Sequence, residues 1–117
     1  IELFGQANAE FIKGRQVSVT GGLVDFLRGA AESDGGRAIL ALASTARKGA
    51  ISRIVPRLPN DATSIARADV QIVVTEHGVA DLKHKSIEDR AQALIAIADP
   101  QFHDQLAADW HEIRKGL

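Results

Sequence analysis

The sequence has no cysteine, no methionine and no tyrosine, and it contains one tryptophan and three prolines in 117 residues. Without cysteine the chain has no disulfide, no thiolate metal site and no cysteine nucleophile, and we expect a reducing, cytoplasmic setting. No segment approaches the roughly 18 consecutive apolar residues of a membrane-spanning helix. Charge is balanced as well, with 14 Lys and Arg against 15 Asp and Glu. This balance argues against nucleic acid or an acidic membrane surface as the main partner.

The remaining composition is that of an ordinary globular domain, with 45% apolar and 25% charged residues. Such a chain buries enough apolar surface to fold, so we expect one ordered domain over residues 1–117. Its first residues, Ile1-Glu2-Leu3-Phe4, have the pattern of a strand interior and lack the features of a signal peptide. We therefore expect the chain to be a piece of a longer protein.

Short apolar segments alternate with helical patterns along the chain, which is typical of an α/β fold. We predict strands over residues 16–20, 38–43, 51–55 and 70–75, and a loop over residues 57–63. Residues 38–43 form a continuous apolar run that is suited to burial on both faces. This run and residues 70–75 are expected at the centre of the sheet.

Three helices are predicted from the spacing of apolar residues. The first begins at Leu23 and ends near Ser33, and the second follows Ser86, a favourable N-cap. Asp99-Pro100 ends the second helix and starts the third. The apolar stripe of this third helix is expected to pack on the sheet; it consists of Phe102, Leu106, Trp110 and Ile113.

Two glycines, Gly21 and Gly22, separate the first predicted strand from the first predicted helix. Glycine lets a backbone approach a ligand closely, and free N–H groups in the first turn of a helix bind anions or developing oxyanions. The alternative is a tight turn that binds nothing.

A second candidate site directly follows the second predicted strand and contains Ser44, Thr45, Arg47 and Lys48. Ligands of open α/β sheets bind beyond the carboxyl ends of strands, and two hydroxyls with two cations suit a phosphate-bearing ligand. The alternative is a solvated polar loop. Arg53 lies within an apolar predicted strand and therefore needs either an ion pair or a bound anion.

A third candidate is the pair Glu76-His77, which follows the strand over residues 70–75 and offers groups for acid–base chemistry. A lone pair of this kind is not a catalytic site. The four histidines have no metal-ligand spacing, so we expect no metal. The sequence also lacks a P-loop, a G-x-G-x-x-G motif and a G-x-S-x-G motif.

Four segments, taken in order, cover nearly the whole chain: GQANAE (residues 5–10), SVTGGLVDFLRGA (18–30), GGRAILALASTARKGAISRIVP (35–56) and ARADVQIVVTEHGVADLKHKSIEDRAQALIAIADPQF (66–102). Together they resemble the C-terminal domain of the acetyl-CoA hydrolase/4-hydroxybutyrate CoA-transferase family, a branch of the class I CoA-transferases. The resemblance and the pattern agree on an α/β fold with an open sheet, mixed or mostly parallel, flanked by helices.

The resemblance implies an enzyme that moves coenzyme A between carboxylates, with acyl-CoA and small carboxylates as substrates and no tightly bound cofactor. In such enzymes a glutamate attacks the acyl-CoA, and a mixed anhydride and then a glutamyl-CoA thioester form. That glutamate belongs to a part of the family pattern upstream of this chain. Glu76 imitates it superficially, and we interpret Glu76 and Arg53 as scaffold. We expect this chain alone to be inactive.

By resemblance, this chain contributes half of an active site. Gly22, with Gly21 beside it, supplies backbone N–H groups for the oxyanion of the acyl intermediates, where such donors are typically worth about 3 kcal/mol. Arg47, with Lys48 next to it, matches the cation that holds CoA. Asn8 falls where the family has a polar active-site residue.

The chain departs from the family pattern around the glycine pair and in the sequence after Ser44. Val19 or Thr20 stands where the family usually has a further glycine, and Leu23 often replaces glutamine. These changes put substrate range in doubt. The alternatives are an acyl-CoA hydrolase and a non-catalytic domain for CoA binding or assembly. An isolated half exposes the face meant for the missing N-terminal domain, so self-association, as a homo-oligomer, is expected.

Overall fold

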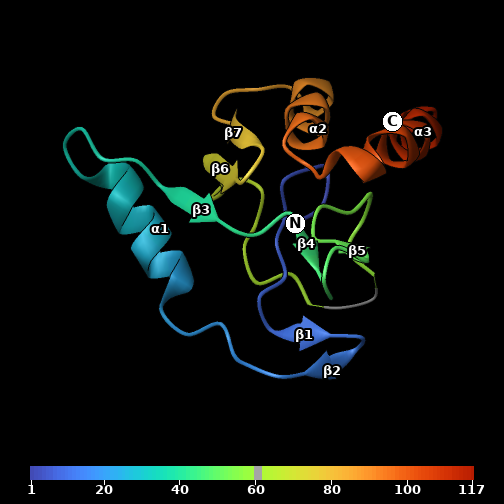
Figure 1. Cartoon of the computed structure of the whole chain (residues 1–117). Coiled ribbons are helices and arrows are strands. Elements are labelled where there is room, and N and C mark those ends of the chain that lie inside the picture. The colour runs from blue at the N-terminus through green and yellow to red at the C-terminus, as the bar shows by residue number, and fades with distance from the viewer. Residues whose placement is uncertain (60–61) are drawn as a thin grey trace.

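The computed structural model describes residues 1–59 and 62–117, and the chain forms a mixed α/β domain (Figure 1). Its strands are β1 (Phe11–Ile12), β2 (Arg15–Gln16), β3 (Ile39–Ala41), β4 (Thr45–Ala46), β5 (Ile51–Ser52), β6 (Ile72–Thr75) and β7 (Gly78–Asp81). Its helices are α1 (Leu23–Glu32), α2 (Ile87–Ala96), the 3-10 helix η1 (Pro100–Phe102) and α3 (His103–Arg114). The predicted loop over residues 57–63 includes residues 60–61, which lie outside the described residues.

The largest sheet has three strands in the order β3-β6-β7. β3 runs parallel to β6, with Ile39 opposite Ile72, whereas β7 runs antiparallel to β6 after a tight turn. The sheet is therefore mixed, and the predicted central position of residues 70–75 is confirmed. Residues 38–43 instead supply the edge strand β3. The prediction that they are buried on both faces is wrong, because Ile39 is 53% exposed.

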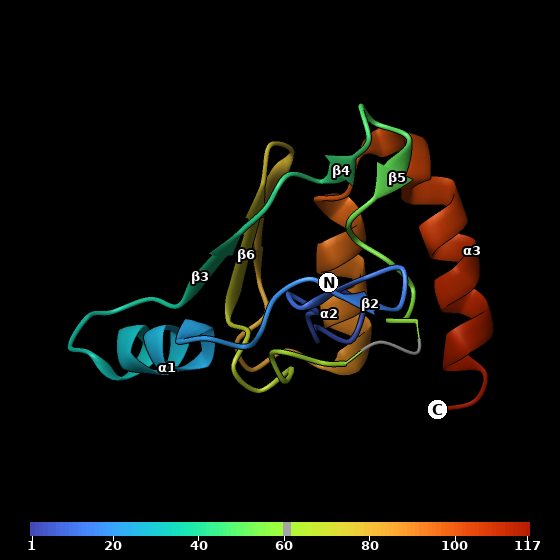
Figure 2. The same cartoon turned by 90° about the horizontal axis from the view of Figure 1, so that it is seen from below.

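Two layers of helix lie on one side of this sheet and α1 lies on the other (Figure 2). α2 packs against β7, and α3 packs against α2. Ser86 begins α2 as predicted, since its hydroxyl accepts the N–H of Asp89. Asp99 accepts the N–H of Gln101 at the start of η1, which α3 then continues.

The prediction that the apolar stripe of α3 packs on the sheet is wrong. Trp110 and Leu106 are buried, and the Trp110 ring meets the Phe4 ring edge to face, with 5.6 Å between centroids. The Trp110 indole N–H donates to Glu88 of α2. The stripe therefore joins α2 to the N-terminal segment. The apolar residues of that segment include Leu3 and Phe4, and no sequence pattern predicts where they pack.

The predicted strands over residues 16–20 and 51–55 are shorter in the structure. β2 ends at Gln16, after which Val17 and Val19 are 57% and 68% exposed. β5 ends at Ser52, and Val55 makes an isolated bridge to Glu2. The carbonyl of Glu10 accepts the N–H groups of Val17 and Ser18, but among the described residues no strand pairs with residues 17–20, and alternation of polar and apolar residues produces a strand only beside such a partner.

Candidate functional site

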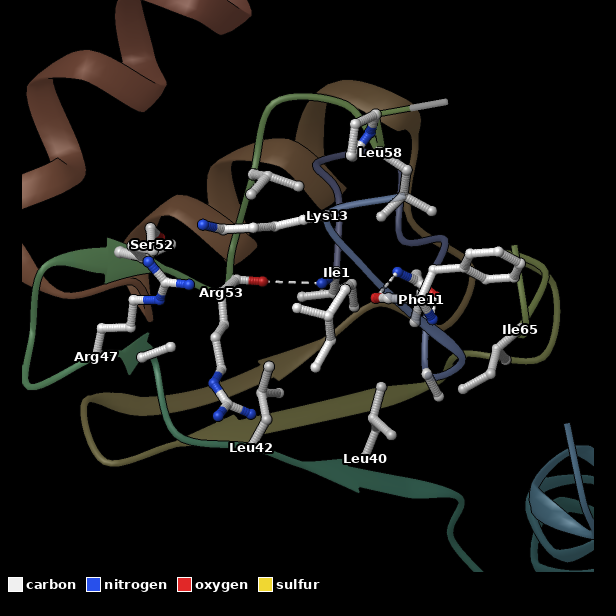
Figure 3. A pocket seen from close by; sticks show the side chains of 18 of the residues that line it. Ile1, Phe11, Lys13, Leu40, Leu42, Arg47, Ser52, Arg53, Leu58 and Ile65 are labelled. Atoms are coloured by element: carbon white, nitrogen blue, oxygen red, sulfur yellow. Dashed lines mark hydrogen bonds between the residues drawn. The ribbon is translucent and has the colours of Figure 1, made fainter. Parts of the chain in front are cut away.

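A pocket of about 540 Å³ lies between β3, the β4–β5 hairpin and the N-terminal segment with β1 (Figure 3). Its walls are mostly apolar, and no acidic residue is found among the described residues that line it. These residues come from positions 1–13, 23, 40–59 and 65. Concave, largely apolar pockets with a few polar groups are the usual binding sites of small molecules. This pocket is therefore the candidate functional site.

Three cations line the pocket: Lys13, Arg47 and Arg53. Figure 3 shows them toward the β4–β5 end, whereas Phe11, Leu40 and Ile65 lie toward the other end. Within residues 1–59 and 62–117, none of the three cations has a carboxylate oxygen within 4.0 Å. The site therefore combines an unpaired positive end with an apolar end, which suits a ligand with an anionic group on an apolar body.

Two tight turns place two of these cations. Lys13 and Gly14 connect β1 to β2, and both have positive φ, 54° and 72°, as in a type I′ hairpin. Arg47 and Lys48 follow β4 with φ of 50° and 56°. Left-handed backbone costs an L-residue roughly 1–2 kcal/mol. Strain of this kind persists where the surrounding structure fixes it, often at functional sites.

The β4–β5 turn is fixed at two points. The N–H of Arg53 donates to the carbonyl of Ser44 at 2.7 Å, and the side chain of Gln101 donates to the carbonyl of Gly49 at 3.0 Å. Of the two cations predicted here, Arg47 lines the pocket, whereas its neighbour Lys48 is not among the lining residues. Both cations are exposed.

Asn8 also lines the pocket, but its amide is engaged in a local turn. The side-chain oxygen accepts the N–H groups of Glu10 and Phe11, and the side-chain nitrogen donates to the carbonyl of Phe11. Asn8 thus shapes the entry into β1. The side-chain nitrogen keeps a second N–H that no described residue accepts, so the amide can still donate to a ligand.

The glycine pair lies outside the pocket, although Leu23, the next residue, lines it. Gly22 is the N-cap of α1, with φ of −91°, and Gly21 has φ of 53°. Among the described residues, no acceptor takes the N–H of Gly22. The backbone donors at the start of α1 are therefore available to a ligand beside the pocket.

Glu76 connects the carboxyl end of β6 to the segment after β3. Its carboxylate accepts the hydroxyl of Ser44 at 2.6 Å and the N–H of Ser44 at 2.8 Å. The hydroxyl bond, followed by the backbone bond, lowers the pKa of Glu76 from 4.5 to about 2. These contacts agree with a scaffold role for Glu76. The neighbouring His77 lies 3.6 Å from a carboxylate oxygen of Asp99.

In the described parts of the chain, no three His, Asp or Glu side chains gather closely enough to bind a metal ion. The helices found there are also too short or too polar to span a bilayer.

The arrangement defines an α/β domain with a pocket at the edge of its sheet that is lined by cations at one end. A family model described as the acetyl-CoA hydrolase/transferase C-terminal domain matches residues 1–110. The chain belongs to this family.

Curated relatives carry CoA-transferase names. The 4-hydroxybutyrate coenzyme A transferase of Clostridium kluyveri is 50% identical over 107 residues, which are 91% of this chain and 25% of that protein. The butyryl-CoA:acetate CoA-transferase of Anaerostipes caccae is 42% identical over 113 residues, or 93% of this chain and 25% of that protein. The chain thus spans about a quarter of the length of these relatives.

Solved structures agree in fold. RipA of Yersinia pestis superposes with a TM-score of 0.90 at 42% identity, covering 97% of this chain and 26% of that one. A 4-hydroxybutyrate CoA-transferase of Porphyromonas gingivalis superposes with a TM-score of 0.75 at 44% identity, covering 100% of this chain and 24% of that one.

Sequence reasoning misses Lys13, and it leaves Arg53 open between an ion pair and a bound anion before interpreting it as scaffold, whereas Arg53 lines the pocket. The signal for Lys13 is weak: glycine follows it, as in many hairpin turns, but Lys-Gly is not a preferred turn pair, and of the flanking pairs only Phe11-Ile12 favours a strand. No pattern indicates, however, that this turn faces the β4–β5 hairpin, since about thirty residues separate them.

Proposed function

We propose that this chain is the C-terminal half-site of an acyl-CoA:carboxylate CoA-transferase of the acetate/4-hydroxybutyrate type. The observation that carries the proposal is the pocket with three cations at one end, none of them paired with a carboxylate of residues 1–59 or 62–117, and apolar walls at the other end. Coenzyme A thioesters combine negative phosphates with a long uncharged arm and an acyl group, which matches this division. The names of the similar relatives support the same substrate class.

The proposed reaction needs a glutamate from the part of the protein that precedes this chain. Its carboxylate attacks the thioester carbonyl and forms a mixed anhydride, and the CoA thiolate leaves. The thiolate then attacks the glutamyl carbonyl of the anhydride, giving an enzyme thioester and releasing the first carboxylate. A second carboxylate repeats these steps in reverse and leaves as the new acyl-CoA.

In this reaction the residues of this chain bind and stabilise. Arg47, supported by Lys48, attracts the phosphates of CoA. The N–H of Gly22, with that of Gly21 beside it, donates to the oxyanion that forms when the acyl carbonyl becomes tetrahedral. Asn8 keeps β1 in place at the pocket wall, because its amide closes the turn before that strand.

The preceding part of the protein packs against the exposed apolar residues on the side of α1. Val17, Val19 and Ile39 are more than half exposed, and Phe26 is 80% exposed. The curated relatives are about four times as long as this chain, so their remaining length is available to cover such a surface.

The test uses the complete protein that contains this chain. We expect it to transfer CoA from acetyl-CoA to butyrate or 4-hydroxybutyrate. Arg47→Ala raises KM for the acyl-CoA about tenfold or more, in line with the loss of a charge-assisted contact. Lys83→Ala, which removes an exposed cation that does not line the pocket, leaves KM unchanged.

Gly22→Pro tests the oxyanion role, because proline has no backbone N–H to donate. The backbone of Gly22 has negative φ, and no acceptor among the described residues takes its N–H, so the change removes the donor without breaking a hydrogen bond of the domain. We expect kcat to fall about 100-fold while the thermal midpoint stays within a few degrees. Unchanged kcat contradicts the role of Gly22. Release of free CoA at the same rate without an added carboxylate identifies a hydrolase instead.

A further inference from the structure

Helix α1, which carries the glycine pair at its start, has few attachments to the rest of the domain. Only Leu27 is fully buried among its residues, and no side chain caps its first turn. Irregular segments, residues 17–22 and 33–38, connect it on both sides. Figure 1 shows α1 set apart from the other helices. Its orientation therefore depends on a small number of contacts.

The most specific of these contacts is an ion pair between Arg28 of α1 and Asp69. The Arg28 Nε donates to one carboxylate oxygen at 2.8 Å, and the Arg28 Nη2 donates to the other at 2.9 Å. Two parallel bonds between planar groups fix direction as well as distance. Within the described residues, this is the one side-chain contact by hydrogen bonds that joins α1 to another segment.

Asp69 lies in a turn that shortly precedes the central strand of the sheet. Its N–H donates to the carbonyl of Ala66 at 3.0 Å in a tight turn, and the next residue, Val70, is buried. β6 begins two residues later, at Ile72. The ion pair thus connects α1 to the start of β6 rather than to a loop far from the sheet.

The geometry points to the Arg28–Asp69 pair as a positioning device for the glycine pair: we propose that it sets the orientation of α1, and through it the placement of the Gly22 N–H. Arg28 lies six positions after Gly22, or about 9 Å along the helix axis. At that distance, a tilt of about 6° about Arg28 moves Gly22 by about 1 Å. A displacement of 1 Å can cost about 100-fold in rate. This inference rests on the proposed function.

An exposed ion pair contributes little to stability, so its effects on folding and on rate can be separated. The Arg28 side chain is 59% exposed and that of Asp69 is 15% exposed, and ion pairs that water reaches in this way contribute little to stability. A positioning role therefore predicts a change in kcat without a matching loss of stability.

The experiment compares five variants in the complete protein. We expect Arg28→Met and Asp69→Asn each to lower kcat about tenfold or more, with KM for acyl-CoA within about twofold and little change in thermal midpoint. Arg28→Lys retains the charge without the paired bonds and gives an intermediate kcat. The exchange Arg28→Asp with Asp69→Arg restores part of the lost kcat.

Two outcomes overturn the inference. One is a kcat that does not change in Arg28→Met, and the other is a kcat that falls in proportion to a loss of folded protein. Failure of the proposed function has a different signature, since the wild-type protein then transfers no CoA, or Gly22→Pro, which removes the N–H, leaves kcat intact. The Arg28→Met/Asp69→Asn double variant is expected to match the single variants, because both remove the same contact.

Discussion

At the scale of single residues, Glu76 shows how a carboxylate that imitates a nucleophile can serve the scaffold. It follows β6 directly, yet both of its short contacts go to Ser44, more than thirty positions earlier in the chain. A carboxylate whose negative charge is stabilised by two hydrogen bonds from one residue is a weak nucleophile toward a thioester. The residue thus fixes the segment that leads into β4.

We expect acid to weaken this contact. The folded-state pKa of Glu76 is lowered from 4.5 to about 2, so its stabilising contribution is complete above about pH 4.5 and is lost as the pH falls toward 2. Water screens the contribution, since the side chain is 49% exposed.

Glu76→Gln should therefore reduce the unfolding free energy at pH 7 and flatten its fall between pH 4.5 and 2. Urea denaturation at pH 7, 4.5 and 3 measures the effect, with the exposed Glu32→Gln as control. An identical pH dependence in Glu76→Gln and wild type contradicts this account.

At the scale of elements, α1 and the turn that follows it respond differently to an added methyl group. A Cβ on Gly29, within α1, has open space around it, whereas a Cβ on Gly36 collides with the Ser33 hydroxyl and with the carbonyl oxygen of Ala30. A backbone carbonyl in a helix cannot move aside as a flexible side chain can. The chain therefore needs glycine after α1 but not inside it.

Gly29→Ala should stabilise α1 by about 0.5–1 kcal/mol, because alanine loses less conformational entropy in a helix. Gly36→Ala should destabilise the end of α1 by about 1–3 kcal/mol through overpacking. Amide hydrogen exchange of α1 measures both changes locally. Equal protection in the two variants is the result that speaks against this interpretation.

The elements that the sequence predicts well are those whose signals are local. Ser86 and Asp99 start helices where their side chains can accept backbone N–H groups, and β6 is central because its apolar run faces neighbours on both sides. Residues 38–43 have a similar apolar run, yet β3 is an edge strand. Composition shows that a face is apolar, but whether another element covers it depends on the rest of the fold.

At the scale of the whole molecule, the candidate site is assembled from segments that the sequence keeps apart. Resemblance indicated Arg47 and Asn8, and the fold brings both to one pocket. The glycine pair remains at its margin, next to Leu23. Lys13 joins the pocket only because the β1–β2 hairpin folds toward β4 and β5. Such placements depend on tertiary packing and have no periodic signal.

The exposed apolar surface beside α1 predicts different effects of one substitution in this chain alone and in the complete protein. In this 117-residue chain, Phe26→Ser should change the unfolding free energy by less than about 0.5 kcal/mol, because the ring is already exposed. In the complete protein the same change should lower the thermal midpoint by several degrees, as the loss of a buried aromatic does. Parallel thermal unfolding of both proteins makes the comparison. Equal shifts in the two contradict a covering role for the preceding part.

The parallel pairing of β3 with β6 has a consequence for how the chain acquires its structure. Ile39 and Ile72 are neighbours in the sheet although more than thirty residues separate them, whereas β6 and β7 are joined by a tight turn. Closing the longer loop costs more chain entropy, so the β6–β7 hairpin is expected to form first. During synthesis from the N-terminus, β3 leaves the ribosome before β6, the strand with which it pairs. Until residue 75 has emerged, the edge strand has no partner and must be kept from pairing with other nascent chains.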